Sequence, residues 1–284
     1  MAASIARRMW TLFEPLHAVT YFAPAARDHF EVAGLRGYWR GYFAGRSAPL
    51  GAVDAAPVIA AFFSFAPRMV SRALPDVWSR ATPAAVLAAR EAGAVASLRP
   101  LVNMRESDIA EAADWLTEAA AHADVAGRVL GAANAALPVP DEPLARLWRA
   151  TTVLREHRGD GHVAALVGYE FDGCEALVWR SSIDLDRDFL QPARGWTDEE
   201  WEAARERLVV RGWLNADGTA SHIGNQARQS IERITDNAAG RPWRAVGEKG
   251  TDRLIELLVP LARKVWSVIP LTNPIGLPQP DAVV

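Results

Sequence analysis

The chain has 284 residues, of which 50% are hydrophobic, and its formal net charge is −3 at pH 7. This charge supplies no global field that would attract a polyanion, so we expect no membrane partner and do not expect DNA as a partner. The single cysteine, Cys174, excludes an intramolecular disulfide framework, and no run of about 18 apolar residues predicts a membrane span. These features predict a cytoplasmic protein.

Helical periodicity dominates the chain. Alternating β-branched runs, which are typical of strands, are limited to short pieces near 208–214 and 219–223. The fold class that we predict is therefore mainly α.

The first group of polar and aromatic side chains lies near the N-terminus. His17 and Tyr21 are four residues apart and therefore share one face of a helix. In segment 36–46, aromatic and arginine side chains recur at steps of three and four residues, a pattern suited to stacking on a planar ring or clamping an anion. The alternative is an aromatic core stripe with solvated arginines. The ligand-binding candidates of this region are His17, Tyr21, Trp39, Arg40, Tyr42 and Arg46.

A proline-rich segment divides the chain almost in half. We predict an N-terminal degenerate winged-helix-like domain over 1–130, a linker over 131–143 and a C-terminal winged-helix-like domain over 144–269. The proline-rich tail, 270–284, is expected to be extended over the surface.

Segment 155–162 contains six ionisable residues in eight positions. We place it at a turn between helices, with Asp160 capping a helix that begins at His162. A neutral histidine acts as a base near pH 7 when a carboxylate orients it, whereas arginine suits an anionic ligand. The catalytic candidates are His157, Asp160 and His162, and Arg155 and Arg158 are ligand-binding candidates.

The same histidines and aspartate are also the ligand types of a metal site. Their spacing matches no established metal motif, however, and the neighbouring arginines oppose a cation. We therefore predict no metal and no other cofactor.

The second half has the element order of a winged helix. A helix opens at Thr197 or Asp198 and ends before Gly212, a tight turn follows at 217–218, and a long helix covers about 225–239. In a winged helix, the first turn of the second helix of the helix-turn-helix faces DNA. Here that turn is acidic and would repel phosphate, which is a second reason not to expect DNA binding.

The first half repeats this order in weaker form. The helix that opens after 51–54 corresponds to the helix that opens after 195–198, and it is expected to extend to residue 70. We therefore predict two winged-helix-like halves with short wing hairpins, arranged as a fused pseudo-dimer. Two unrelated helical halves with similar caps are the alternative.

Three segments, 33–51, 154–162 and 231–236, resemble an actinobacterial family that is labelled as helix-turn-helix proteins. The resemblance covers roughly residues 10–276. It implies a tandem winged-helix fold, and some members of the family lie in natural-product gene clusters. The label itself implies DNA binding.

The two halves are expected to enclose a pocket between segments 17–46 and 157–162. The predicted function is small-molecule binding in specialised metabolism, with a cofactor-independent enzyme as one form of it. In that enzyme, His157, Asp160 or His162 would serve as acid and base, and Arg46 or Arg158 would stabilise an oxyanion. The alternative is a ligand-responsive DNA-binding transcriptional regulator, and a scaffold without a small ligand is a third possibility. We expect a monomer or homodimer.

Overall fold

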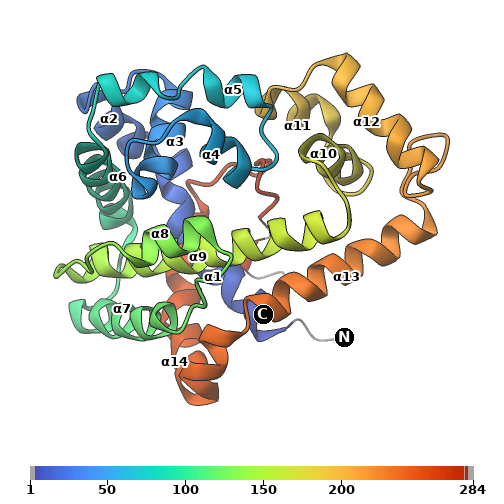
Figure 1. The fold of residues 1–284 in the computed structure, drawn as a ribbon. Coiled ribbons are helices and arrows are strands. Elements are labelled where there is room, and N and C mark those ends of the chain that lie inside the picture. The colour runs from blue at the N-terminus through green and yellow to red at the C-terminus, as the bar shows by residue number, and fades with distance from the viewer. Residues whose placement is uncertain (1–3, 278, 281–284) are drawn as a thin grey trace.

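The computed structural model describes residues 4–277 and 279–280, in which helices surround one long helix, α9 (Figure 1). The helices of the first half are α1 (Ile5–Phe22), α2 (Pro24–Val32), α3 (Tyr38–Ser47), α4 (Ala55–Ala61), α5 (Pro67–Ser71), α6 (Pro83–Leu98), α7 (Glu106–Ala121) and α8 (Val129–Ala135). Those that follow are α9 (Pro143–Gly168), α10 (Gly173–Ser181), α11 (Arg187–Arg194), α12 (Asp198–Val210), α13 (His222–Ala238) and α14 (Arg241–Trp266). Short 3-10 helices are η1 (Ala48–Leu50), η2 (Asp76–Ser79) and η3 (Arg99–Leu101).

The predicted mainly α fold class is confirmed. Within the described residues, β pairing is limited to one antiparallel bridge between Leu214 and Ala220. The strands predicted near 208–214 and 219–223 are wrong, because α12 ends inside the first segment and α13 begins inside the second. Ser221 provides the side-chain cap that starts α13 there. The wing hairpins and the pseudo-dimer stay predictions.

Helix α9 contributes to two clusters of the hydrophobic core. In the described part of the chain, one cluster of buried side chains joins α9 to α1, α7 and α14, and another joins its C-terminal part to α10, α12 and α13. A further cluster holds α2 to α6 together. None of the described helices is long and apolar enough to cross a membrane.

Helix α9 runs without interruption through 155–162, so the turn predicted in this segment is wrong. Its glycines suggested a break, but one glycine inside a helix costs only about 1 kcal/mol. The buried side chains of Trp148 and Leu154 fix the same helix in the core, and this packing outweighs the local preference. Asp160 therefore does not cap a helix that begins at His162.

The single helix predicted to extend from 54 to 70 is also wrong. The segment forms α4 and α5 with a turn between them, because Pro67 opens α5 and holds Ala66 in an extended conformation. Phe62 and Phe65, at the two sides of this turn, are each 3% exposed.

The segment 131–143, predicted as a linker, contains the larger part of α8, which packs against α9. The domain boundary itself stays a prediction.

The C-terminal tail packs against the second half through specific contacts. Asn273 and Leu277 are buried, and Arg180 donates a hydrogen bond to the carbonyl of Ile275 at 2.9 Å. Of the tail predicted over 270–284, residues 278 and 281–284 lie outside the described residues.

Candidate functional site

A cavity of about 1540 Å³ lies between the two halves of the chain, bounded by α1, α3, α9, α10, α13 and the turn between α4 and α5. Among the described residues, eight arginines and five carboxylates line it beside many aromatic rings. The aromatic lining residues are Trp10, Tyr21, Phe22, Tyr38, Trp39, Tyr42, Phe62, Phe63, Phe65 and Trp179. This composition suits a planar ligand that carries polar or charged groups.

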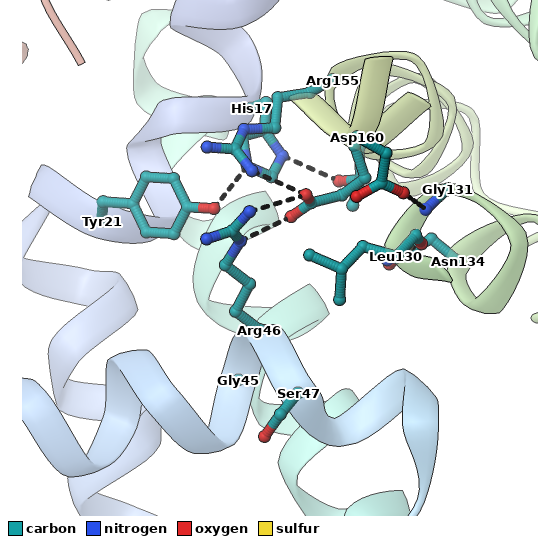
Figure 2. Close-up of polar contacts among 12 residues, drawn as sticks. His17, Tyr21, Gly45, Arg46, Ser47, Leu130, Gly131, Asn134, Arg155 and Asp160 are labelled. Carbon is teal, nitrogen blue, oxygen red and sulfur yellow. Dashed lines mark hydrogen bonds and ion pairs between the residues drawn. The ribbon is translucent and has the colours of Figure 1, made fainter. Parts of the chain in front are cut away.

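A buried ion network borders the cavity, with Arg46 and Arg155 in the cavity lining. Glu156, on α9, accepts two hydrogen bonds from Arg46 of α3 at 2.9 and 3.0 Å and one from Arg155 at 2.7 Å. Figure 2 shows Arg46 and Arg155 directed at the same carboxylate. Burial alone would raise the pKa of Glu156, but the two guanidinium groups outweigh it and hold this pKa well below its usual range. The network therefore fixes a carboxylate anion beside the cavity.

His17 lies behind the cavity wall, in a chain of hydrogen bonds. Its Nδ1 is 3.0 Å from the Thr152 hydroxyl, and its Nε2 is 2.9 Å from the Tyr21 hydroxyl (Figure 2). Because Thr152 donates its own proton to the Trp148 carbonyl, Nδ1 of His17 must donate and Nε2 must accept from Tyr21. Burial, with the nearby charge of Arg155, holds the pKa of His17 well below its usual range. Tyr21 faces the cavity, whereas His17 positions its hydroxyl.

The three catalytic candidates on α9 do not form one group. Asp160 accepts a hydrogen bond from the backbone N–H of Gly131 at 2.8 Å and so caps α8 (Figure 2). His157 is 1% exposed, and within the described part of the chain its Nε2 has no hydrogen-bond partner. His162 donates to Thr235 at 3.0 Å, since the Thr235 hydroxyl donates to a backbone carbonyl. A continuous helix explains this separation, because it turns by about 100° at each residue.

Of these candidates, Asp160 and His162 line the cavity. Burial, reinforced by the charge of Arg158, lowers the pKa of His162 to about 4. His157 has a similar pKa of about 4, caused first by burial and then by the charge of Arg128. No hydrogen bond joins the three side chains in the described structure, and their catalytic role stays a prediction.

The predicted ligand-binding residues separate into two groups. Tyr21, Trp39, Tyr42, Arg46, Arg155 and Arg158 line the cavity. Arg158 forms an ion pair with Asp236 of α13 at 2.9 Å. Arg40 points elsewhere: its side chain is 45% exposed and lies 4.0 Å from Asp76.

Several lining residues escaped the sequence analysis. Trp10 and Glu14 precede His17 and Tyr21 on the same helix face, and Trp10 donates a hydrogen bond to Glu14 at 3.1 Å. Their helical spacing was a usable signal. Arg194 reaches the cavity only through the tertiary fold, for which the sequence offered no local signal.

Helices α11 and α12 are joined by a short turn, as in a helix-turn-helix. Gly195, in the left-handed conformation with φ of 77°, ends α11. Thr197 then caps α12 in a capping box with Glu200, which confirms one of the two predicted caps. A short turn that contains glycine between two helices is typical of this motif.

Three acidic side chains near the start of α12, those of Asp198, Glu200 and Glu202, form ion pairs with arginines. Arg187 pairs with Asp198 and Glu202 at 2.8 and 2.5 Å, and Arg68 of α5 binds both oxygens of Glu200 at 2.7 and 2.8 Å. The turn before α12 also contacts the first half. Arginine therefore offsets part of the negative charge that the sequence places on this helix.

A helix-turn-helix family matches residues 6–270 of the chain. No curated protein and no solved structure matches the chain. The family points to DNA binding, so the expectation that DNA is not a partner is wrong. The charge argument behind that expectation counted the acids of α12 without the arginines that pair with them in the folded chain. The chain belongs to this helix-turn-helix family.

Proposed function

We propose that this protein is a DNA-binding regulator whose affinity for DNA responds to a small molecule in the cavity. One observation carries this proposal: the helices around the helix-turn-helix also form the cavity wall. Helix α10 packs against both α11 and α12, and residues of α10 and α13 line the cavity. A molecule that moves these helices would therefore move the DNA-binding motif.

In this proposal, α12 enters the major groove, as the second helix of such motifs does. Arg207 is 48% exposed on α12 and pairs with Asp172, which caps α10, and with Glu175 of α10. DNA phosphates would replace these carboxylates as partners of the arginine, and this exchange would couple α10 to DNA contact.

The test starts with selection of bound fragments from the genome that encodes the protein, followed by fluorescence anisotropy on a selected fragment. Arg207→Gln should weaken binding, whereas Arg253→Gln should leave it unchanged. Arg253 is a matched control because it is also partly exposed and paired with two carboxylates, Glu111 and Glu256, but it lies on α14. Equal affinities of the two variants would exclude the proposed exchange of Arg207 from its carboxylate partners to DNA phosphates.

The cavity also supports a second candidate, an acid–base enzyme of specialised metabolism that acts through His162. This histidine faces the cavity and is neutral near pH 7. A pKa of about 4 makes it a weak base, however, and this favours the regulator. Chemical turnover of a bound molecule that His162→Gln abolishes would favour the enzyme.

A further inference from the structure

Arg194 is an arginine inside the cavity without a carboxylate partner in the described structure. Its residue is 9% exposed, its Nε has no hydrogen-bond partner, and its guanidinium lies over the Phe65 ring at 4.6 Å. The acceptors of its other nitrogens are the backbone carbonyls of Ala193 and Pro274, at 3.2 and 3.3 Å. These long contacts to neutral groups leave its positive charge unbalanced.

The other arginines of the cavity differ in this respect. Arg233 is exposed on α13, and the remaining ones form ion pairs with carboxylates. These paired residues are Arg7, Arg46, Arg155, Arg158, Arg180 and Arg228. The unbalanced buried charge of the cavity is therefore concentrated at Arg194.

Aromatic rings surround this position. Phe65, beneath the guanidinium, is 5.5 Å from the ring of Tyr42, and Tyr42 is 6.1 Å from the ring of Tyr38 in a stacked arrangement. Both tyrosines line the same cavity. The site combines a desolvated cation with flat apolar surfaces, which together suit a ring that bears an anionic group.

We propose that the cavity binds a planar aromatic carboxylate, with the carboxylate on Arg194 in place of the Pro274 carbonyl and the ring against the side chains of Tyr42 and Phe65. This inference rests on the proposed function, because it names the class of molecule to which the regulator responds.

The position of Arg194 also connects this ligand to DNA binding. Arg194 is the last residue of α11, directly before Gly195 in the turn of the helix-turn-helix. Its backbone carbonyl accepts a hydrogen bond from Ala66 of the first half at 2.9 Å. A carboxylate on the Arg194 side chain therefore acts on the residue that joins this motif to the first half.

The test is isothermal titration calorimetry of the full chain with 2-naphthoate and with the uncharged 2-naphthalenemethanol. Naphthoate should bind roughly tenfold to a hundredfold more tightly, as expected for a charge-assisted hydrogen bond. Arg194→Gln should remove this preference, and Arg194→Lys should retain part of it. Arg187→Gln, on the same helix but outside the cavity lining, should bind naphthoate as the wild type does.

A second pair of variants does not depend on replacing the arginine. Gly159 lines the cavity, and an added Cβ there would meet no atom closer than 3.8 Å. Gly159→Leu should therefore narrow the cavity and weaken naphthoate binding, whereas Gly168→Leu, on the exposed end of the same helix, should not.

Equal affinity for naphthoate and the alcohol, absence of naphthoate binding, or an unchanged preference in a folded Arg194→Gln variant would each overturn this inference. DNA binding of the same preparations, measured without naphthoate, separates the two proposals. Binding of DNA but not of naphthoate overturns only the ligand assignment, and the reverse result overturns the DNA-binding proposal.

Discussion

Two glycines of α9, two positions apart, have opposite surroundings. An added Cβ at Gly159 would lie 3.8 Å from Arg155 Nη1, but at Gly161 it would lie 2.5 Å from Arg128 Nη1. Alanine restricts the unfolded chain and favours a helix, so Gly159→Ala should raise the free energy of unfolding by about 0.5–1 kcal/mol. Gly161→Ala should lower it, because Arg128 would lose its hydrogen bond to the His157 carbonyl. Urea denaturation checks both, and a destabilised Gly159→Ala would contradict the open space at this position.

His157 should make stability depend on pH. Burial, followed by the charge of Arg128, lowers its pKa to about 4 from 6.5 in the unfolded chain. The unfolded chain therefore binds the proton first, so the stabilising contribution is present above pH 6.5 and is lost as the pH falls toward 4. At pH 5 the loss is about 2 kcal/mol relative to pH 7.

The measurement is the free energy of unfolding of His157→Gln at pH 7 and pH 5. This variant should lose less stability between the two pH values than the wild type does. His122→Gln, at an exposed histidine paired with Glu118, is the control and should behave as the wild type. If His157→Gln retains the full pH dependence, burial of this histidine is not its source.

At the residue scale, the sequence was sufficient to predict contacts between side chains of the same helix. The pair of His17 and Tyr21 was predicted from a spacing of four residues, and their hydrogen bond confirms the shared face. The role of Asp160 was not predictable in this way, because its partner, Gly131, lies 29 residues away on α8. Long-range partners are set by packing, which a local pattern does not encode.

At the scale of elements, the glycine in the turn of the helix-turn-helix should be more sensitive to substitution than the glycine that follows α12. Gly195 and Gly212 both have a positive φ, of 77° and 74°. Alanine at either costs roughly 1–2 kcal/mol for the left-handed backbone. At Gly195 its Cβ would also lie 2.9 Å from the sulfur of Met69, whereas at Gly212 nothing lies within 4 Å. Gly195→Ala should therefore destabilise the protein more in urea denaturation, and an equal loss would show that contact with Met69 is unimportant.

Element boundaries were predictable where a side chain caps the helix. Thr197 and its capping box marked the start of α12, and the sequence gives both residues of the box. The turn between α4 and α5 was missed, although Pro67 was visible, because the surrounding apolar residues continue a helical pattern. In α9, by contrast, visible glycines were overinterpreted. Local signals fail where burial of a long apolar face decides the outcome.

At the scale of the whole molecule, the Glu156 network should connect the two halves. Arg46 comes from α3, while Glu156 and Arg155 lie on α9 and are buried beside it. Glu156→Gln leaves two buried guanidinium groups without this anion and should cost about 3–5 kcal/mol of unfolding free energy. Glu111→Gln, which breaks the more exposed pair with Arg253, should change stability little. Similar losses in urea denaturation would contradict a central role for Glu156.

The general architecture could be predicted from the sequence more fully than the function could. Hydrophobic periodicity indicated a mainly α chain because helices bury one continuous face. The exclusion of DNA failed because charge was counted along α12 alone. Arg68, which pairs with Glu200, comes from a helix 132 residues earlier in the chain. Function at a surface depends on such pairings, and they become visible only in the folded chain.

The most direct test of DNA binding is the affinity of the wild-type protein for a selected genomic fragment at about 50 and about 200 mM salt. Arginine contacts to phosphate predict binding at the lower salt concentration and a steep loss at the higher one, with a slope of about −0.9 in log K against log salt for each phosphate neutralised. No retained fragment at the lower salt concentration, or an affinity that does not change with salt, would contradict the account.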